Sequence, residues 1–171
     1  MSTLRLRTKR LSISAVDADD LDELLAVRLS NPERLLRTEG SAGEAGFYDL
    51  GMLERDAMVA AMDSSRHFAA VRGPDGRVIG LLDLLVEHHD DGHPWIGAVE
   101  ILRSEQRKGY GTETLTAALD FLAQERPGTD VHALVDHDDT VAHAFLQSCG
   151  FERTAGPQDR RKLLVFRAVG T

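Results

Sequence analysis

The stretch EQRKGYGTE, residues 105–113, contains two glycines, Gly109 and Gly111, between an apolar run and a helical pattern. A glycine-rich turn at the start of a helix leaves several backbone N–H groups without intrahelical partners. The helix dipole adds about half a positive charge at the same place. Such a turn is suited to an anion, and above all to a phosphate group. Which phosphate it holds depends on the neighbouring residues.

Two common phosphate loops do not fit this stretch. A P-loop needs a lysine directly after its second glycine, but Thr112 and Glu113 follow Gly111. A dinucleotide-binding fingerprint needs a third small residue, where this chain has Thr114, and it normally follows the first strand of a parallel unit. The residues therefore disfavour a nucleotide-binding regulatory domain that takes ATP or NAD.

The first half of the chain has strand, helix and hairpin patterns. Alternation over residues 4–14 changes phase near Lys9, which predicts one bent strand or a pair of strands. A helix with one apolar face is expected from Asp17, a suitable N-cap, to the stop at Asn31-Pro32. The remaining expectations are a long loop or short helices over residues 33–52, a helix over 53–65, and a hairpin over 67–87 that turns at residues 73–76.

The second half continues with the strand that leads into the glycine-rich loop. That strand is expected over residues 95–103, followed by a helix that Pro127-Gly128 ends and by a strand over residues 130–136. A last helix, with Gly150 as its C′ residue, precedes a closing strand over residues 160–169. The order mixes α and β elements and includes several hairpins.

Composition and charge limit the possible classes of protein. A chain of 171 residues with 42% hydrophobic residues can form one domain, which we expect to span residues 1–171. The net charge of −8 argues against a broad basic face for nucleic acid. Cys149 is the single cysteine, so an intrachain disulfide is excluded. No run approaches the roughly 20 apolar residues of a membrane span, and MSTLRLRTKR lacks a signal-peptide core, so we expect a cytoplasmic protein without membrane contact.

The spacing of Gln106, Gly109 and Gly111 resembles the Q/R-x-x-G-x-G/A motif of the GCN5-related N-acetyltransferase (GNAT) superfamily. The later stretch DTVAHAFLQSCGF, residues 139–151, is similar to that family's N-x-x-A-x-x-F-Y-x-x-x-G-F helix. The N-terminal LRLR strand with an acidic helix start after it also looks like this family. The strong resemblance covers about residues 95–151, and a weaker one covers the rest.

The resemblance implies an α/β fold in which helices flank a twisted, mostly antiparallel mixed sheet with one splayed parallel strand pair. It implies transfer of an acetyl group from acetyl-CoA to a primary amine, by direct attack through a tetrahedral intermediate and without a metal. The acceptor would be a small molecule or a protein N-terminus, and the resemblance also allows a homodimer. The alternative from another class is a non-catalytic module that binds or senses acyl-CoA.

In such proteins the loop binds the pyrophosphate of the cofactor, and the strand before it binds the pantetheine arm. An exposed backbone N–H of that strand would stabilise the charge that develops on the thioester oxygen. Carried over to this chain, the cofactor-binding residues are Ile101, Leu102 and Arg103 on the strand, Gln106, Arg107, Lys108, Gly109, Tyr110, Gly111 and Thr112 in the loop, and Asp139 and Phe145 in the last helix.

Glu100 is the candidate general base, because it lies on the strand that would carry the thioester. It can also be interpreted as a surface carboxylate that faces solvent. Three other residues, Asp136, His137 and Glu87, are alternatives for the base and are equally readable as ordinary exposed polar groups.

The expected general acid is absent. The family's tyrosine would fall at position 146, where this chain has Leu146, and leucine cannot donate a proton. Ser148 and Cys149 are close in sequence, but the thiol shares an apolar face and is better interpreted as a buried filler. Asp139 stands where the family often has asparagine. Three alternatives follow from the missing tyrosine. The thiolate could leave without protonation by the enzyme, water or another residue could supply the proton, or the protein could bind acyl-CoA without fast turnover.

A histidine-rich acidic loop, EHHDDGHP at residues 87–94, is a second candidate site. Zinc could bind histidines and carboxylates, but His88 and His89 are adjacent and would point to opposite sides of an extended chain. We therefore expect a solvated loop and no metal. Together with DHDD at residues 136–139, this loop could border the acceptor site and favour a cationic amine.

Overall fold

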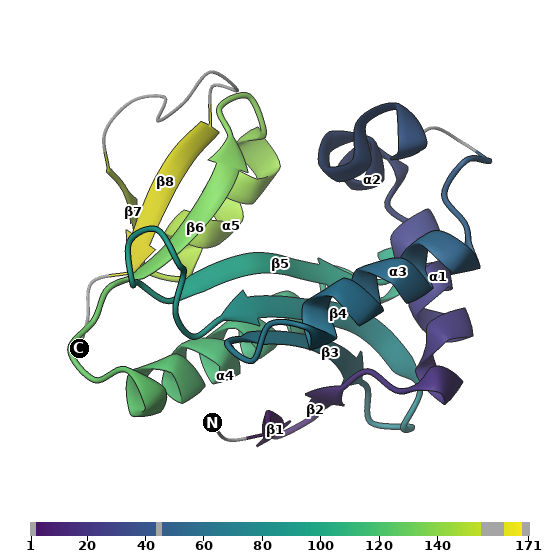
Figure 1. Cartoon of the computed structure of the whole chain (residues 1–171), viewed down its shortest axis with the longest axis horizontal. Coiled ribbons are helices and arrows are strands. Elements are labelled where there is room, and N and C mark those ends of the chain that lie inside the picture. The colour runs from purple at the N-terminus through teal and green to yellow at the C-terminus, as the bar shows by residue number, and fades with distance from the viewer. Residues whose placement is uncertain (1–2, 44–45, 155–162, 169–171) are drawn as a thin grey trace.

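The computed structural model describes residues 3–43, 46–154 and 163–168. Its centre is an eight-stranded sheet with the order β1-β2-β3-β4-β5-β6-β8-β7 (Figure 1). Neighbouring strands are antiparallel except β5 and β6, which are parallel. This confirms the expected fold class. The strands are β1 Arg5–Arg7, β2 Ser12–Ala15, β3 Arg66–Arg72, β4 Val78–Leu85, β5 Trp95–Ile101, β6 Val131–Asp136, β7 Phe151–Arg153 and β8 Leu163–Ala168.

Helices cover both faces of the sheet. They are α1 Leu21–Leu29, α2 Pro32–Glu39, α3 Leu50–Ala61, α4 Tyr110–Glu125 and α5 Thr140–Ser148, with short 3₁₀ helices at Ala18–Asp20, Gly40–Gly43 and Arg103–Glu105. No helix in the described part of the chain is long and apolar enough to cross a membrane.

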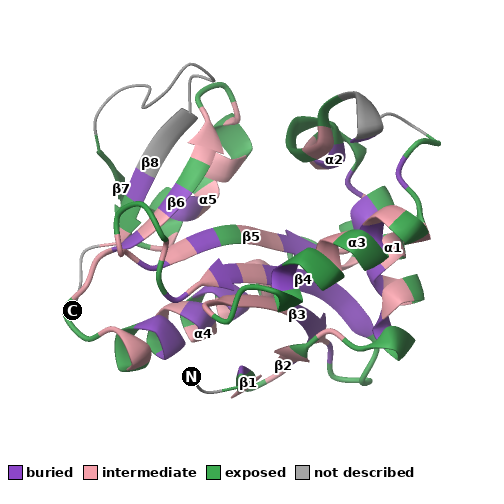
Figure 2. Cartoon of the chain, viewed as in Figure 1, coloured by how far each residue is buried: buried purple, intermediate pink, exposed green. Residues whose placement is uncertain are grey.

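The alternation along β4 divides the core into two apolar clusters. Leu82 and Leu84 belong to the cluster that includes Leu115 and Leu122 of α4, whereas Leu81 belongs to the cluster under α1 and α3. Successive side chains of a strand point to opposite faces, so a strand buried on both sides becomes almost continuously apolar. Figure 2 shows this as buried residues along β4 in the middle of the sheet.

Several element boundaries differ from the sequence expectation. The alternating N-terminal run is a strand pair, and Pro32 not only follows α1 but also begins α2, because proline fits the first turn of a helix. Helix α3 begins at Leu50, where Asp49 accepts a hydrogen bond from the Met52 N–H. The strand after residue 95 ends at Ile101, before the expected residue 103.

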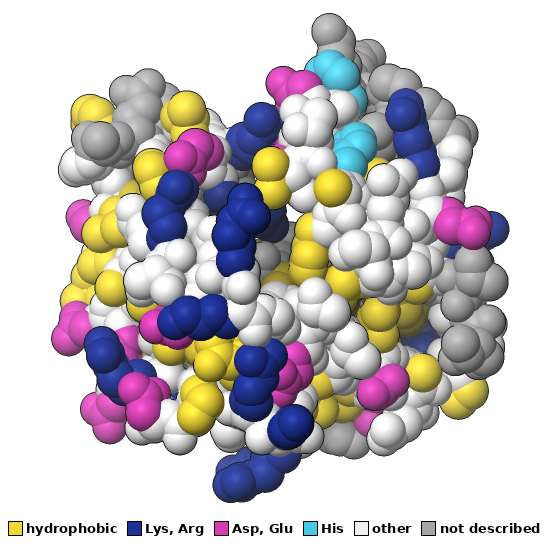
Figure 3. Space-filling view, turned by 180° about the vertical axis from the view of Figure 1, so that it is seen from behind, with side chains coloured by type: hydrophobic (Ala, Val, Ile, Leu, Met, Phe, Trp, Pro, Cys, Tyr) yellow, Lys and Arg dark blue, Asp and Glu magenta, His cyan; other side chains and the backbone are white. Residues whose placement is uncertain are grey.

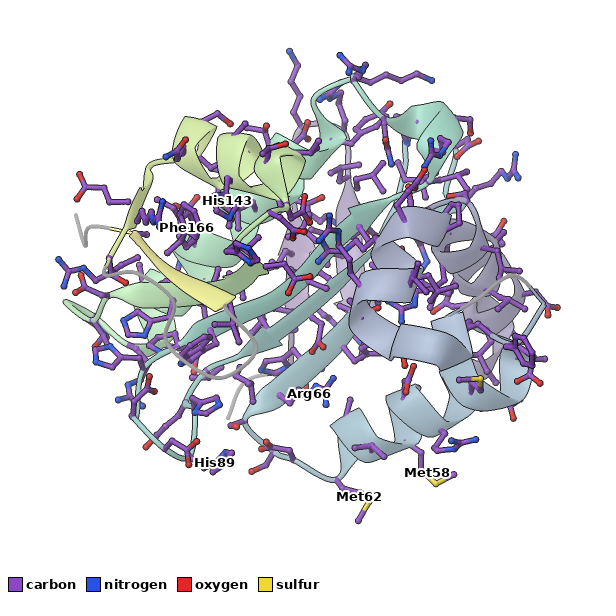
Figure 4. All side chains as sticks on the ribbon, turned by 90° about the horizontal axis from the view of Figure 1, so that it is seen from above. Met58, Met62, Arg66, His89, His143 and Phe166 are labelled. Carbon is purple, nitrogen blue, oxygen red and sulfur yellow. The ribbon has the colours of Figure 1, made fainter. Side chains whose placement is uncertain are left out.

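The C-terminal part contains one element that the sequence patterns did not predict. The short strand β7 follows α5 directly and pairs with β8, which lies between β7 and β6. The closing strand was expected over residues 160–169, of which residues 160–162 and 169 lie outside the described part. Figure 4 shows His143 of α5 directed at Phe166 of β8. Their ring centroids are 4.8 Å apart, and this edge contact ties α5 to the sheet.

The parallel pair β5–β6 is short. Its register contains only Trp95 with His132 and Ile96 with Ala133. On the other side of β5 the pairing with β4 shifts at Gly97, which is left as an extra residue in a bulge. Beyond this point β5 continues along β4 while β6 continues along β8, so the two strands separate.

Candidate functional site

A cleft of about 280 Å³ opens where β5 and β6 separate. Helix α2 lies on one side of it and α5 on the other (Figure 1). The residues that line it are Arg34, Arg37 and Thr38 of α2, Ile96, Gly97, Ala98 and Val99 of β5, Ala133, Leu134, Val135 and Asp136 of β6, and Asp139, Ala142, Phe145 and Leu146 at α5. The backbone of β5 at residues 97–99 has no partner in β6. This strand edge can therefore bind an extended ligand by main-chain hydrogen bonds.

Arg37 crosses the mouth of this cleft from α2 to the turn after β6. Its Nη1 atom lies 2.8 Å from Asp138 Oδ1 and 3.2 Å from Asp136 Oδ2, and its Nε atom lies 3.8 Å from Asp139 Oδ2. The hydrogen bond from Arg37 holds the pKa of the Asp138 carboxyl below its usual value. The acidic stretch at residues 136–139 thus already has a cationic partner within the chain.

The glycine-rich loop has the backbone geometry of an anion-binding turn. Gly109, the N-cap residue of α4, has φ +85°, a conformation that glycine adopts without steric cost. Arg107 has φ 60° and is therefore a non-glycine residue in the left-handed region. The first turn of α4 begins at Tyr110, so its N–H groups lack intrahelical acceptors and face outward along the helix axis.

Arg10, from the turn between β1 and β2, supports this loop. Its Nη1 atom donates to the Lys108 carbonyl oxygen at 2.8 Å, and its Nε atom donates to Glu113 Oε2 at 2.7 Å. The guanidinium also stacks over the Tyr110 ring, 4.4 Å from the ring centroid. Basic side chains gather near the centre of the face seen in Figure 3. No pattern around Arg10 in the sequence indicates this role, because its partners lie about a hundred residues away.

Gln106 makes contacts within the protein that fix the end of β5. Its Nε2 atom donates to Asn31 Oδ1 at 2.7 Å and to the Ile101 carbonyl at 2.9 Å. Asn31 in turn donates to the same Ile101 carbonyl at 3.0 Å and to the Val27 carbonyl at 3.1 Å. Through this amide pair, the buried Asn31 joins α1, β5 and the glycine-rich loop. Asn31 was not among the residues predicted for the site.

The strand residues predicted to hold the pantetheine arm lie beside the cleft and do not line it. Ile101 is buried, and the Leu102 N–H donates to the Ile79 carbonyl at 2.8 Å. Arg103 lies in a 3₁₀ turn, where its Nε atom donates to the Ser30 carbonyl at 2.7 Å. The unpaired strand edge lies earlier, at residues 97–99. The periodicity of the sequence did not indicate that the unpaired edge lies at residues 97–99, because the bulge at Gly97 shifts the register of β5 against β4.

Glu100 is buried, with 2% of its surface exposed, so the interpretation as a surface carboxylate is wrong. It lies on the sheet face covered by α1, opposite to the face of Val99. Its Oε2 atom accepts from Arg28 Nη1 at 3.1 Å, whereas its Oε1 atom is buried without a hydrogen-bond partner. Burial raises the pKa of the Glu100 carboxyl, and the Arg28 charge only partly offsets this effect. Glu100 itself does not line the cleft, although its neighbour Val99 does.

The three alternatives for the base occupy different places. Asp136 lines the cleft but is bound by Arg37. His137 is exposed in the turn after β6. Glu87 is exposed and pairs with Arg126 at 2.6 Å. Of the three, only Asp136 is among the residues that line the cleft.

The α5 residues predicted for the site meet the cleft and the loop. Asp139 is the N-cap of α5 and accepts from the Ala142 N–H at 3.1 Å. The Phe145 ring packs on Gly111, where a β-carbon would lie 3.5 Å from it. Leu146 is buried in the core and lines the cleft. The Ser148 hydroxyl donates to the Phe145 carbonyl at 2.6 Å, and Cys149 is half-buried against the same core.

The histidine-rich loop packs at the closed end of the parallel pair. The rings of His93 and His132 stack with centroids 4.3 Å apart, and Asp91 accepts hydrogen bonds from the Trp95 indole at 3.2 Å. Within residues 3–43, 46–154 and 163–168, no group of three or more His, Cys, Asp and Glu side chains is arranged to hold a metal ion.

Comparison with known proteins gives the same overall picture. The family model described as "Acetyltransferase (GNAT) family" matches residues 33–151. No curated protein matches the chain. A GCN5-related N-acetyltransferase from Brucella melitensis is 15% identical and superposes with a TM-score of 0.80, over 99% of this chain and 80% of that one.

Two further solved structures are similar over almost their whole length. An acetyltransferase from Thermus thermophilus is 19% identical, with a TM-score of 0.67 over 96% of this chain and 98% of that one. The PaiA N-acetyltransferase from Thermoplasma acidophilum, solved in complex with coenzyme A, is 14% identical, with a TM-score of 0.70 over 93% and 98% of the two chains. At these identities the likeness shows the fold.

Proposed function

The chain belongs to the acetyltransferase (GNAT) family, and from this premise we propose that it transfers the acetyl group of acetyl-CoA to a primary amine. Acetyl-CoA-dependent acyl transfer follows from the family. The amine acceptor and the roles of individual residues are our proposals. The observation that carries them is the separation of β5 from β6 directly beside a glycine-rich helix start.

The residues present fit a molecule with a pyrophosphate at one end and an extended arm. The left-handed Gly109 and the first N–H groups of α4 suit the pyrophosphate, and the proposed loop ligands are the backbone groups of residues 107–112. The strand edge at residues 97–99 offers main-chain groups to the arm, and Phe145 closes the space over Gly111. Gln106, by contrast, is proposed to hold the loop in place through Asn31.

In the proposed reaction the nitrogen of the amine attacks the thioester carbonyl carbon directly. A new C–N bond forms, the C–S bond breaks, and the electron pair leaves with sulfur as the thiolate of coenzyme A. A backbone N–H of the unpaired β5 edge would stabilise the negative charge on the carbonyl oxygen. The amine loses one proton, and the thiolate gains one.

Glu100 remains our candidate for the group that accepts the amine proton. A carboxylate with a raised pKa is a stronger base than an ordinary one, which favours this role. Because Glu100 is buried and paired with Arg28, it would act through an intervening group and not by direct contact with the amine. For the thiolate we propose protonation by solvent, because Leu146 cannot donate a proton.

A second candidate function is binding or sensing of acyl-CoA without turnover. Two observations favour it: Leu146 stands at the position expected for a tyrosine, and Glu100 has no direct access to the cleft. The two functions are separated by measuring free thiol released from acetyl-CoA with a panel of primary amines, alongside acetyl-CoA binding by calorimetry. Amine-dependent thiol release supports the transferase. Tight binding without release on any amine supports the sensor.

A further inference from the structure

The α2 wall of the cleft carries two arginines with different surroundings. Arg37 is held by three carboxylates, as described above. Arg34, one turn earlier on the same helix, also lines the cleft. Among the residues that the structure describes, no carboxylate lies within ion-pair distance of Arg34, and its Nε atom is buried without a hydrogen-bond partner.

An unpaired guanidinium nitrogen is costly inside a protein. A buried donor without an acceptor loses its hydrogen bonds to water and gains none in return, and the cost is larger when the group is charged. Glu100 is close enough to interact electrostatically with Arg34, but its hydrogen bond goes to Arg28. Arg34 therefore lines the cleft with a guanidinium for which the described residues supply no acceptor.

The position of Arg34 indicates which ligand it would meet. It shares the cleft with the β5 edge at residues 97–99, where we place the thioester. The loop residues 107–112, proposed for the pyrophosphate, are not among the residues that line this cleft. An anion at Arg34 would thus belong to the acceptor, next to the reacting centre, and not to the phosphates of the cofactor.

We propose that Arg34 binds a carboxylate of the acceptor, and that the acceptor is a small molecule of the amino-acid class with a primary amine and a carboxylate. A guanidinium matches a carboxylate with two parallel hydrogen bonds, which fixes orientation as well as position. Arg37 cannot take this role because Asp136 and Asp138 already neutralise it. The inference rests on the proposed amine acetylation and disfavours a protein N-terminus, which lacks an adjacent carboxylate.

The test compares each standard amino acid that has a primary α-amine with its α-carboxamide, in which a neutral amide replaces the α-carboxylate. For the best acceptor, the acid should exceed the amide about 10- to 100-fold in kcat/KM. Arg34→Gln should remove this difference by lowering the value for the acid alone, with the KM for acetyl-CoA unchanged. Arg34→Lys should restore part of the difference, and Arg37→Gln should preserve the acid-to-amide ratio.

Calorimetric titration of the same amino acids into the protein with coenzyme A separates this inference from the proposed function. Binding of the acid that is lost in Arg34→Gln supports the carboxylate site, even if no amine is acetylated and the transferase proposal fails. Equal use of acid and amide by the unaltered protein would overturn the inference. So would an Arg34→Gln variant whose main defect is weaker acetyl-CoA binding.

Discussion

The guanidinium of Arg10 donates to the carbonyl oxygen of Lys108 across 98 positions of sequence, with an Nη1–O distance of 2.8 Å. The same side chain pairs with Glu113 in the first turn of α4. Arg10 thereby holds the glycine-rich loop from outside, and it orients the backbone that we propose for the pyrophosphate. This contact joins the N-terminal hairpin to the proposed cofactor site.

Replacing Arg10 with glutamine should loosen the loop and weaken acetyl-CoA binding. We expect Kd for acetyl-CoA to rise about threefold to tenfold. This is a smaller effect than loss of a buried charged hydrogen bond would have, because the Arg10 side chain is partly exposed. Calorimetric titration with acetyl-CoA measures this change in Kd. Arg5→Gln, an exposed arginine on β1, is the control and should leave Kd unchanged. An Arg10→Gln protein with unaltered affinity would show that the contact does not shape the loop.

The two glycines of the loop should respond differently to alanine. Gly109→Ala forces a β-carbon into a left-handed residue and within 3.1 Å of Arg10 Nη2, so we expect a loss of about 1–2 kcal/mol in the free energy of unfolding. Gly111 lies inside α4, and its β-carbon would make only ordinary contact with Phe145 at 3.5 Å. Gly111→Ala should therefore raise the free energy of unfolding by up to about 1 kcal/mol. Urea unfolding measures both variants. Equal effects of the two changes would contradict this geometry.

Arg107 is a non-glycine residue with φ 60°, so glycine should be better tolerated there. Arg107→Gly should raise the free energy of unfolding by up to about 1 kcal/mol, since relief of strain exceeds the added entropy of the unfolded chain. Arg107→Ala keeps the strain and serves as the control, with stability near that of the unaltered protein. Urea unfolding measures both. Loss of stability in Arg107→Gly would mean that the loop is not strained at this residue.

Burial of Glu100 should make folding stability depend on pH. Its folded-state pKa is raised above the ordinary value of 4.5, so the folded state holds this proton more strongly than the unfolded chain. The unaltered protein should thus lose stability, relative to Glu100→Gln, as pH rises from about 4.5 through the folded-state pKa, and the difference should then level off. Urea unfolding of both proteins at a series of pH values measures the difference. Parallel curves would contradict the raised pKa.

Turnover tests the catalytic role of the same residue. Glu100→Gln should lower kcat about 100-fold with little change in acetyl-CoA binding, because the amine loses its proton acceptor. Glu39→Gln is the matched control, since Glu39 pairs with the same Arg28 from α2 at 2.8 Å and has no proposed part in the reaction. Normal turnover by Glu100→Gln would exclude Glu100 as the base. Asp136 would then be the next candidate, because it lines the cleft.

Short-range patterns predicted most of the helices and strands, although not β7, and long-range contacts decided the details of the site. The loop at residues 105–113 and the helix that ends before Gly150 could be predicted because their turn and cap signals are local. The partners of Gln106 and Arg37 could not, since Asn31 lies 75 positions from Gln106 and Asp138 lies 101 positions from Arg37. The alternation around Glu100 showed that it points away from Val99, but it could not show that α1 covers that face.

The most direct test of the central claim is calorimetric titration of the intact protein with acetyl-CoA, ATP and NAD in parallel. Saturable one-to-one binding of acetyl-CoA, with no comparable binding of the other two, is the predicted result. Binding should be abolished in Gly109→Trp, whose side chain would fill the loop, while the circular dichroism spectrum stays unchanged. Absence of acetyl-CoA binding, or equally tight binding to Gly109→Trp, would contradict the assignment of this loop to coenzyme A.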